Sequence, residues 1–427
     1  MRTVAAAAPR LLLIALALSV LHPAGSRRSK TAKRAGGCAR PWEETKPGHV
    51  FDKCDVDELT PEELTPELFA EKYSLRRPLI IRNASDNAAA RRFLANRCDI
   101  IERFGDVKVD LGDPFSLVVH GRATSSMSLR EYLDTPFDLK APRYFFDRLG
   151  HWMEHLGELN ELLESPGSVQ LQPADAAAPI IFAIGKTASG IGLHAHQDAW
   201  NQVLFGAKRW TLYPGSPGGV PKEAGYNPTE PHLSWLHDVY PKVKDDDATK
   251  PMECIQYAGD VIYVPEGWYH ATVNLGDTGA IARRTEEFTP GSSRELGGRA
   301  IKAVMSQRHD AAVSLAEQAQ EIDPKEGDHA INMGHALDGA GRRSEAKAAF
   351  QRAVELMPRN PGSYLTLGKL LNEMGEYGAA GGSLSRGRGL VSAAGEDNPL
   401  AQALKDELSK SRKARAEQKA QRQGGEL

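Results

Sequence analysis

The sequence has no large excess of charge of either sign, which limits the partners it predicts. Its 427 residues carry 53 Lys and Arg against 56 Asp and Glu, a formal net charge of -3 at pH 7. Nucleic-acid-binding domains are typically strongly basic, so electrostatics give no reason to expect a nucleic-acid partner. We interpret the basic cluster Arg27-Arg28-Ser29-Lys30 and the charged C-terminal tail as solvated termini.

Cysteines are scarce, and none forms a CxxC pair, so the sequence indicates neither a redox motif nor a zinc ribbon. The four are Cys38, Cys54, Cys98 and Cys254. In an oxidising compartment, an even number permits two disulfides with three possible connectivities. Cys38 with Cys54 would close a short N-terminal loop. The alternative is that some of the four are free, buried thiols.

Long apolar runs are absent after the N-terminus. Leu11 to Leu21 is apolar apart from Ser19, follows Arg2 and Arg10, and precedes the small residues Ala24-Gly25-Ser26. This pattern predicts a secretory signal over residues 1–26; an uncleaved anchor or an organelle transit peptide are the alternatives. No later segment has the length and composition to cross a bilayer, so no membrane span is expected after signal cleavage.

We therefore expect the protein in the endoplasmic reticulum lumen or outside the cell. The sequon Asn83-Ala84-Ser85 predicts N-glycosylation at Asn83 in such a compartment. The C-terminal Gly-Gly-Glu-Leu bears only a faint likeness to a retention signal, so secretion stays open.

The composition is that of a globular protein, with 41% hydrophobic and 26% charged residues, and the length predicts two or three domains. We divide the chain after the signal into a polar segment (27–54), a mixed domain (55–292), helical repeats (296–392) and a charged tail (393–427). Thr-Pro-Glu starts, N-cap residues and apolar periodicity predict helices over 60–73, 88–104, 128–133 and 234–239, and strands over 79–82, 107–111 and 116–119.

Short apolar runs between Gly and Pro residues over 180–273 indicate a small β-barrel or sandwich. Residues 203–214 are predicted to be a strand pair or one long bent strand, and 261–264 a further strand. Beyond about 295 the pattern becomes helical and repeats at 34 residues. That period is typical of tetratricopeptide repeats: two clear units, with the tail from Leu404 as a frayed or disordered helix.

The most informative motif is His196-Gln197-Asp198, followed far downstream by His270. On a strand, residues i and i+2 face the same side, so His196 and Asp198 can reach one ion while His270 arrives from another strand. Two imidazoles and a carboxylate are the facial triad of non-haem Fe(II) oxygenases. His194 shares the predicted face as a competing ligand or supporting group. We favour the set that begins at His196, because His194 would place His196 at the carboxylate position.

The surrounding residues resemble the jumonji-C (JmjC) branch of the cupin fold. The likeness covers roughly residues 55–290 and is carried by the runs 73–81, 143–146, 192–201, 204–214 and 259–274. Within that family, runs 233–241 and 251–254 look closest to the group resident in the endoplasmic reticulum lumen. Members of that group can lack the acidic ligand, whereas this chain has Asp198.

The resemblance implies an α+β chain: a double-stranded β-helix (cupin, jelly-roll) JmjC domain with flanking helices, followed by an all-α domain of tetratricopeptide-like repeats. It implies Fe(II) at His196, Asp198 and His270, and the co-substrate 2-oxoglutarate with its distal carboxylate on Lys208. Asn201, Tyr144 and Asn274 are further candidates to bind the co-substrate. The implied reaction converts 2-oxoglutarate to succinate and carbon dioxide and hydroxylates a C–H bond.

The leading hypothesis is a dioxygenase that hydroxylates a protein or peptide substrate in the secretory pathway, or demethylates it through hydroxylation, while the repeats bind a protein partner. A second hypothesis is an inactive JmjC scaffold acting through the repeats. A third, a cupin-type binder or isomerase of small molecules, is disfavoured by Lys208 and by the Trp200-Asn201 context.

Overall fold

The computed structural model describes residues 41–43, 54–84, 87–112, 125–138, 143–147, 180–215, 219–227, 230–284, 289–391 and 399–424. The expected signal, Cys38, Ser85 of the sequon and the expected strand 116–119 lie outside these residues. None of the helices within them combines the length and apolar character needed to cross a membrane.

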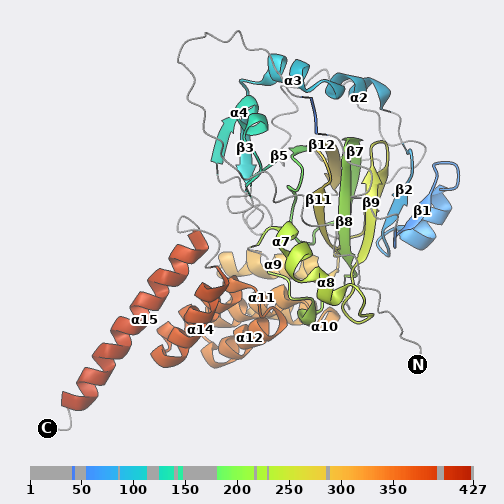
Figure 1. Cartoon of the computed structure of the whole chain (residues 1–427). Helices are drawn as coiled ribbons and strands as arrows, with labels where there is room; N and C mark the ends of the chain where they lie inside the picture. The colour runs from blue at the N-terminus through green and yellow to red at the C-terminus, as the bar shows by residue number, and fades with distance from the viewer. Residues whose placement is uncertain are drawn as a thin grey trace, which may run out of the picture.

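Two β-sheets followed by a helical array make up the described chain, with the helices below the sheets in the view of Figure 1. The larger sheet contains, in spatial order, β1 (Asp57–Leu59), β2 (Leu79–Ile81), β10 (Val261–Val264), β7 (Ala199–Phe205), β12 (Thr278–Arg284), β6 (Ile181–Gly185), β5 (Tyr144–Asp147), β3 (Lys108–Gly112) and β4 (Ser125–Ser128). The smaller contains β11 (Tyr269–Asn274), β8 (Ala207–Tyr213) and β9 (Met252–Tyr257). The predicted sheet-rich domain with following helical repeats is confirmed.

The β7–β8 connection turns at one glycine. Gly206 has φ +78°, and a Cβ there would lie 2.4 Å from the Asp277 carbonyl oxygen. Only glycine tolerates both the left-handed backbone and this approach. The chain therefore leaves the larger sheet after Phe205 and enters the smaller one at Ala207. Of the two predictions for residues 203–214, two strands are correct and one long bent strand is not.

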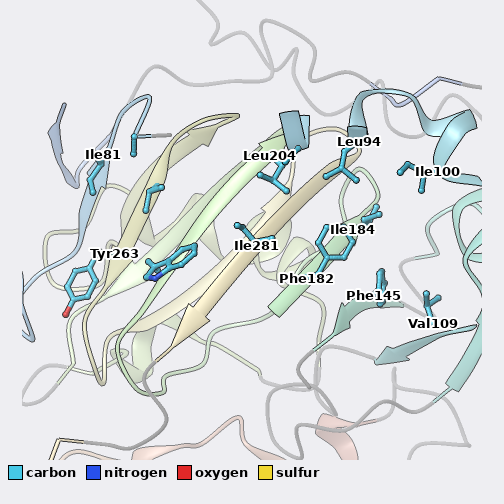
Figure 2. Packing of buried hydrophobic residues seen from close by; sticks show 14 of the residues in the cluster. Ile81, Leu94, Ile100, Val109, Phe145, Phe182, Ile184, Leu204, Tyr263 and Ile281 are labelled. Atoms are coloured by element: carbon cyan, nitrogen blue, oxygen red, sulfur yellow. The ribbon is translucent and has the colours of Figure 1, made fainter. Parts of the chain in front are cut away.

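One face of the larger sheet carries the main apolar core. Side chains from strands across the sheet, such as Phe182, Leu204 and Ile281, pack with Leu94 and Ile100 of two covering helices (Figure 2). Those helices are α2 (Ala88–Ala95) and α3 (Arg97–Phe104). A single helix was predicted over 88–104, but Asn96 is extended and its side chain caps α3 by accepting from the Cys98 amide. Asparagine competes with the helical backbone in this way, which explains the break.

Smaller helical elements confirm the cap signals only in part. Thr65 caps α1 (Pro66–Leu68), which continues as a π-helical turn η1 (Phe69–Tyr73), whereas helix had been predicted from Thr60. Ser128 caps α4 (Leu129–Asp134) as expected. The remaining short elements of the domain are η3 (Lys222–Ala224), α7 (His232–Asp238) and α8 (Tyr240–Val243).

A disulfide joins Cys54 to Cys254 on β9, 200 residues apart in sequence. The suggested Cys38–Cys54 loop is therefore wrong, because Cys54 is already paired. Cys98 is also disulfide-bonded. Sequence spacing favoured the nearby cysteine, whereas the fold brings the start of the domain against the smaller sheet. Asn83 is exposed with φ 50°, directly after β2, and its glycosylation stays a prediction.

The helical array consists of three antiparallel pairs and a final long helix: α9 (Ser293–Met305), α10 (His309–Ile322), α11 (Gly327–Gly339), α12 (Arg343–Leu356), α13 (Pro361–Glu373), α14 (Tyr377–Leu390) and α15 (Pro399–Gly424). Positive φ occurs at Gln307, Gly341 and Gly375, each 34 residues apart and each in the turn within a pair. The first pair, α9 and α10, thus keeps the turn geometry of the other two pairs with Gln307 in place of glycine.

The repeated glycines inside the helices let paired helices approach closely. A Cβ on Gly334 would lie 2.3 Å from the Phe350 ring, and one on Gly368 would lie 2.4 Å from Leu384. Both pairs pack an α-helix against its antiparallel partner within one repeat. The 34-residue spacing of small and large residues is thus a packing pattern.

The charged tail is more ordered than its composition predicted. Helix α15 is continuous, and Leu404, Leu408 and Ser411 are buried. The Ser411 hydroxyl donates to the Tyr377 carbonyl oxygen at 2.8 Å. These apolar and small residues are outnumbered by charged ones, which is why composition alone suggested fraying.

We predict that Gly334→Ala destabilises the repeats by about 1–3 kcal/mol, the usual cost of overpacking a filled core, because the new methyl group overlaps Phe350. Gly382→Ala in α14 is the matched control. Nothing lies within 4 Å of its new Cβ, so the change should stabilise the helix by about 1 kcal/mol. Urea unfolding followed by circular dichroism measures both. Equal changes in the free energy of unfolding of the two variants would contradict the packing of Gly334 against Phe350.

Candidate functional site

Three histidines meet at one end of the interior between the sheets. The ligand atoms that His194, His196 and His270 offer lie within 4.8 Å of one another. The ring centroids are 4.3 Å apart for His194 and His270, and 4.7 Å apart for His196 and His270. This is the spacing of side chains able to share one metal ion.

Backbone pairing with β11 places His194 beside His270. The His194 amide donates to the His270 carbonyl at 3.1 Å, and the His270 amide donates back at 2.8 Å. The Thr272 amide donates to the Ile191 carbonyl in the same ladder. A Cβ on Gly190 would lie 1.8 Å from the Thr272 carbonyl oxygen, so glycine permits the close approach.

Each histidine ring is held in one tautomer. The Nδ1 atoms of His194, His196 and His270 lie 2.8, 2.5 and 2.9 Å from the carbonyl oxygens of Gly192, Gln197 and Trp268, respectively. A carbonyl oxygen can only accept, so each Nδ1 carries the proton and each Nε2 keeps its lone pair. Backbone carbonyls orient metal-binding histidines in this way in known sites.

The protonation state also suits metal binding. Burial, and then the charges of His194 and His196, hold the pKa of His270 well below its usual range. A neutral imidazole is the form that binds a metal ion. His270 is therefore in the form that binds a cation at neutral pH.

Asp198 lies outside this cluster. Strand β7 begins only at Ala199, so the premise that His196 and Asp198 lie on one regular strand is wrong. The Tyr263 hydroxyl donates to the Asp198 carboxylate at 3.4 Å, and Tyr263 belongs to the apolar core on the other face of the sheet. The structure thus groups two of the three predicted ligands, His196 and His270, with His194, and Asp198 lies outside that group.

A buried cation lies in the same interior. Lys208 on β8 is 3% exposed, and its ammonium donates to the Tyr144 hydroxyl at 3.1 Å and to the Asn274 side-chain oxygen at 3.0 Å. Across the smaller sheet, Lys208 pairs with Asn274, four residues from His270 on the same face of β11. The structure thus brings together three of the residues that the sequence suggested for co-substrate binding, and their role in binding stays a prediction.

The polar cradle around Lys208 lacks an anion. Within the described residues, no carboxylate pairs with this ammonium; both of its hydrogen-bond partners are neutral. A buried charge is costly unless it is paired. The side-chain oxygen of Asn201 is also buried without a hydrogen-bond partner. These unmet polar groups fit a bound dicarboxylate.

Two residues that sequence analysis missed complete the cradle. The Asn274 amide nitrogen donates to the Ser189 hydroxyl at 3.0 Å. A Cβ on Gly185 would lie 1.8 Å from that nitrogen and 2.6 Å from Tyr144. The Gly-rich run from 185 to 192 was the available signal, since close approach to a ligand cradle requires glycine.

Arg283, unexplained from sequence, lies outside the interior. It pairs across strands with Trp200, and its guanidinium carbon is 6.0 Å from the Trp200 ring centroid. Burial lowers its pKa. It therefore belongs to the outer face of the larger sheet and not to the candidate site.

The histidine cluster, the buried lysine and the two-sheet fold define a class of protein. Residues 188–284 match the JmjC domain described as a hydroxylase, and residues 330–360 match the tetratricopeptide repeat. The chain therefore contains a JmjC domain followed by C-terminal tetratricopeptide repeats.

Among similar proteins, human JmjC domain-containing protein 8 is 29% identical over 243 residues, which cover 55% of this chain and 85% of that protein. The bifunctional arginine demethylase and lysyl-hydroxylase psr-1 of Caenorhabditis briggsae is 32% identical over 155 residues, 34% of each chain. The zebrafish (Danio rerio) 2-oxoglutarate and iron-dependent oxygenase JMJD4 is 34% identical over 84 residues, 19% of each chain. A solved structure, the Sgt2 TPR domain from Aspergillus fumigatus, is 23% identical and covers 31% of this chain and 83% of its own, with a TM-score of 0.27.

We predict that His194→Ala weakens metal binding by more than about 100-fold, because even changes outside the ligand shell cost roughly 10- to 100-fold. Asp198→Ala is the matched control and should bind within a few-fold of the wild type. Anaerobic equilibrium dialysis with Fe(II), and Co(II) absorption spectra, measure this. If Asp198→Ala weakened metal binding and His194→Ala did not, the ligands would instead be His196, Asp198 and His270.

Proposed function

We propose that this protein is a 2-oxoglutarate-dependent JmjC dioxygenase that hydroxylates a polypeptide. One observation carries the proposal. A buried, anion-free Lys208 lies in the same interior as three histidine Nε2 atoms that are held ready for a metal ion. A dicarboxylate that bridges a metal and an ammonium meets both demands at once.

His194, His196 and His270 would hold Fe(II), since their tautomers present three lone pairs within reach of one ion. When bound, the iron would supply dioxygen activation coupled to oxidative decarboxylation of 2-oxoglutarate. Three neutral imidazoles leave the full double charge on the ion, whereas a carboxylate would cancel half of it. This extra positive charge favours an anionic co-substrate.

The residues of the chain bind and orient the co-substrate. Lys208 would pair with its distal carboxylate, and Tyr144 and Asn274 fix the position of the ammonium. The buried side chains of Trp210 and Leu212, on the same strand face as Lys208, exclude water from the interior. A dry interior strengthens each of these charge interactions.

A second candidate function is a scaffold that binds metal without turnover. The observation that favours it is the make-up of the cluster. It contains three histidines, whereas Fe(II) oxygenases of this type bind the metal with two histidines and one carboxylate. The tetratricopeptide repeats would then carry the function by binding a protein partner. Co-substrate turnover separates the two candidates.

We predict succinate formation from 2-oxoglutarate by the wild-type protein with Fe(II), and its loss in Lys208→Met. Loss of a charge-assisted hydrogen bond costs about 1.5–3 kcal/mol, so 2-oxoglutarate affinity should fall roughly 10- to 150-fold. Metal affinity should not change, because Lys208 is not in the histidine cluster. Metal binding without succinate formation in the wild type would establish the scaffold instead.

For the compartment, we propose the lumen of the secretory pathway. The N-terminal signal pattern, the Asn83 sequon and the Cys54–Cys254 disulfide support it, because disulfides persist in oxidising compartments. A C-terminally tagged protein should resist added protease in intact microsomes and become sensitive after detergent. Degradation before detergent would contradict this location.

A further inference from the structure

A large cavity lies between the JmjC domain and the repeats. Its volume is about 1070 Å³, and its wall includes His194, Tyr226 and Tyr269 on one side and Arg294, Asp328 and Arg352 on the other. Pockets for small molecules measure about 300–1,000 Å³, so this one has room beyond a small co-substrate. Since His194 lines it, the cavity reaches the histidine cluster.

We propose that this cavity binds a polypeptide segment, that the repeats form one of its walls, and that Asp328 anchors a lysine or arginine side chain of that segment. A neighbouring residue of the segment then faces His194. The anchoring role is separate from the residue that is oxidised. The link to catalysis rests on the function proposed above, whereas peptide binding does not.

Polar contacts hold the two walls together. The Tyr269 hydroxyl lies 2.8 and 2.7 Å from the two carboxylate oxygens of Glu326, and Arg294 pairs with Glu326 at 2.6 Å. Arg294 and Glu326 are 16% and 5% exposed, so this pair is largely shielded from solvent. At the other side, Arg359 lies 3.6 Å from Glu230. The repeats are therefore fixed beside the strand that carries His270.

Most charges on the cavity wall are already paired. Arg294 pairs with Glu326, Arg359 with Glu230, Arg352 with Glu355 at 3.2 Å, and Lys222 with Glu223 at 3.7 Å. Asp323 accepts a hydrogen bond from the Lys325 amide, and the exposed Lys325 ammonium forms no ion pair within the described chain. Among the lining carboxylates, Asp328 is the one with neither an ion pair nor a hydrogen bond within the described chain.

Asp328 is the group that a basic guest would satisfy. Within the described chain its carboxylate has neither a hydrogen bond nor an ion pair, although its neighbours Arg294 and Glu326 balance each other. Asp328 is exposed to solvent on the cavity wall, and the protein packed around it, followed by the Glu326 charge, raises its pKa to about 6. A guest cation would relieve the excess negative charge here, whereas a guest carboxylate would add to it.

The test uses the full chain and fluorescein-labelled nonapeptides that differ only at the central residue, which is Lys, Arg, Ala or Glu in a Gly/Ser background. Fluorescence anisotropy should show tighter binding of the Lys and Arg peptides. Asp328→Asn, which keeps the side-chain shape, should weaken their binding roughly 10-fold or more. Asp328→Lys should reverse the preference toward the Glu peptide.

Glu345→Gln is the matched control. Glu345 lies on α12, pairs with Arg342 at 2.6 Å and does not line the cavity, so peptide affinity should stay unchanged. Thermal unfolding of each variant checks that the fold is retained. Four results overturn the proposal: no binding of any peptide up to about 1 mM, equal binding of all four, a wild-type preference for Glu, or unchanged Lys-peptide affinity in a folded Asp328→Asn or Asp328→Lys variant.

Binding and turnover fail separately in this design. If basic peptides bind through Asp328 but no succinate forms, the peptide site is supported and the oxygenase function is contradicted. If succinate forms but peptide binding does not depend on Asp328, the oxygenase function is supported and the peptide anchor is contradicted.

Discussion

The candidate site depends on one stretch of backbone pairing, the ladder that joins the segment 189–194 to β11. Reciprocal hydrogen bonds between His194 and His270 fix two imidazoles side by side, and Gly190 allows the approach. The same strand carries Asn274, which holds the ammonium of Lys208 from the adjacent strand. One strand thus positions both His270 of the histidine cluster and Asn274 beside Lys208.

The repeats, several strands and helix caps, and part of the candidate site could be predicted from the sequence because their signals are local. The 34-residue spacing of Gly334 and Gly368 records direct packing against Phe350 and Leu384. The strand 261–264 and the cap at Ser128 were predicted at the residues where they occur. Lys208 and Tyr144 could be named together because resemblance to a known family relates distant segments, and Asn274 could be added because it shares a strand face with His270.

The errors arose where long-range contacts override local pattern. The sequence His-x-His-x-Asp offers two overlapping ligand pairs, and which one faces the interior depends on where β7 begins. That boundary, at Ala199, is set by pairing with β10 and β12. The disulfide was mispredicted for the same reason. Cys54 pairs with a cysteine 200 residues away in sequence because the fold brings the two side chains together in space.

The contact between Tyr269 and Glu326 has a consequence for communication between the two halves of the chain. Tyr269 is bonded through the main chain to His270, so its ring cannot move far without disturbing that imidazole. A displacement of Glu326 must either break the hydrogen bond that the Tyr269 hydroxyl shares between its two carboxylate oxygens or pull on β11. The start of α11 is therefore mechanically tied, through a single tyrosine side chain, to the residue next to His270.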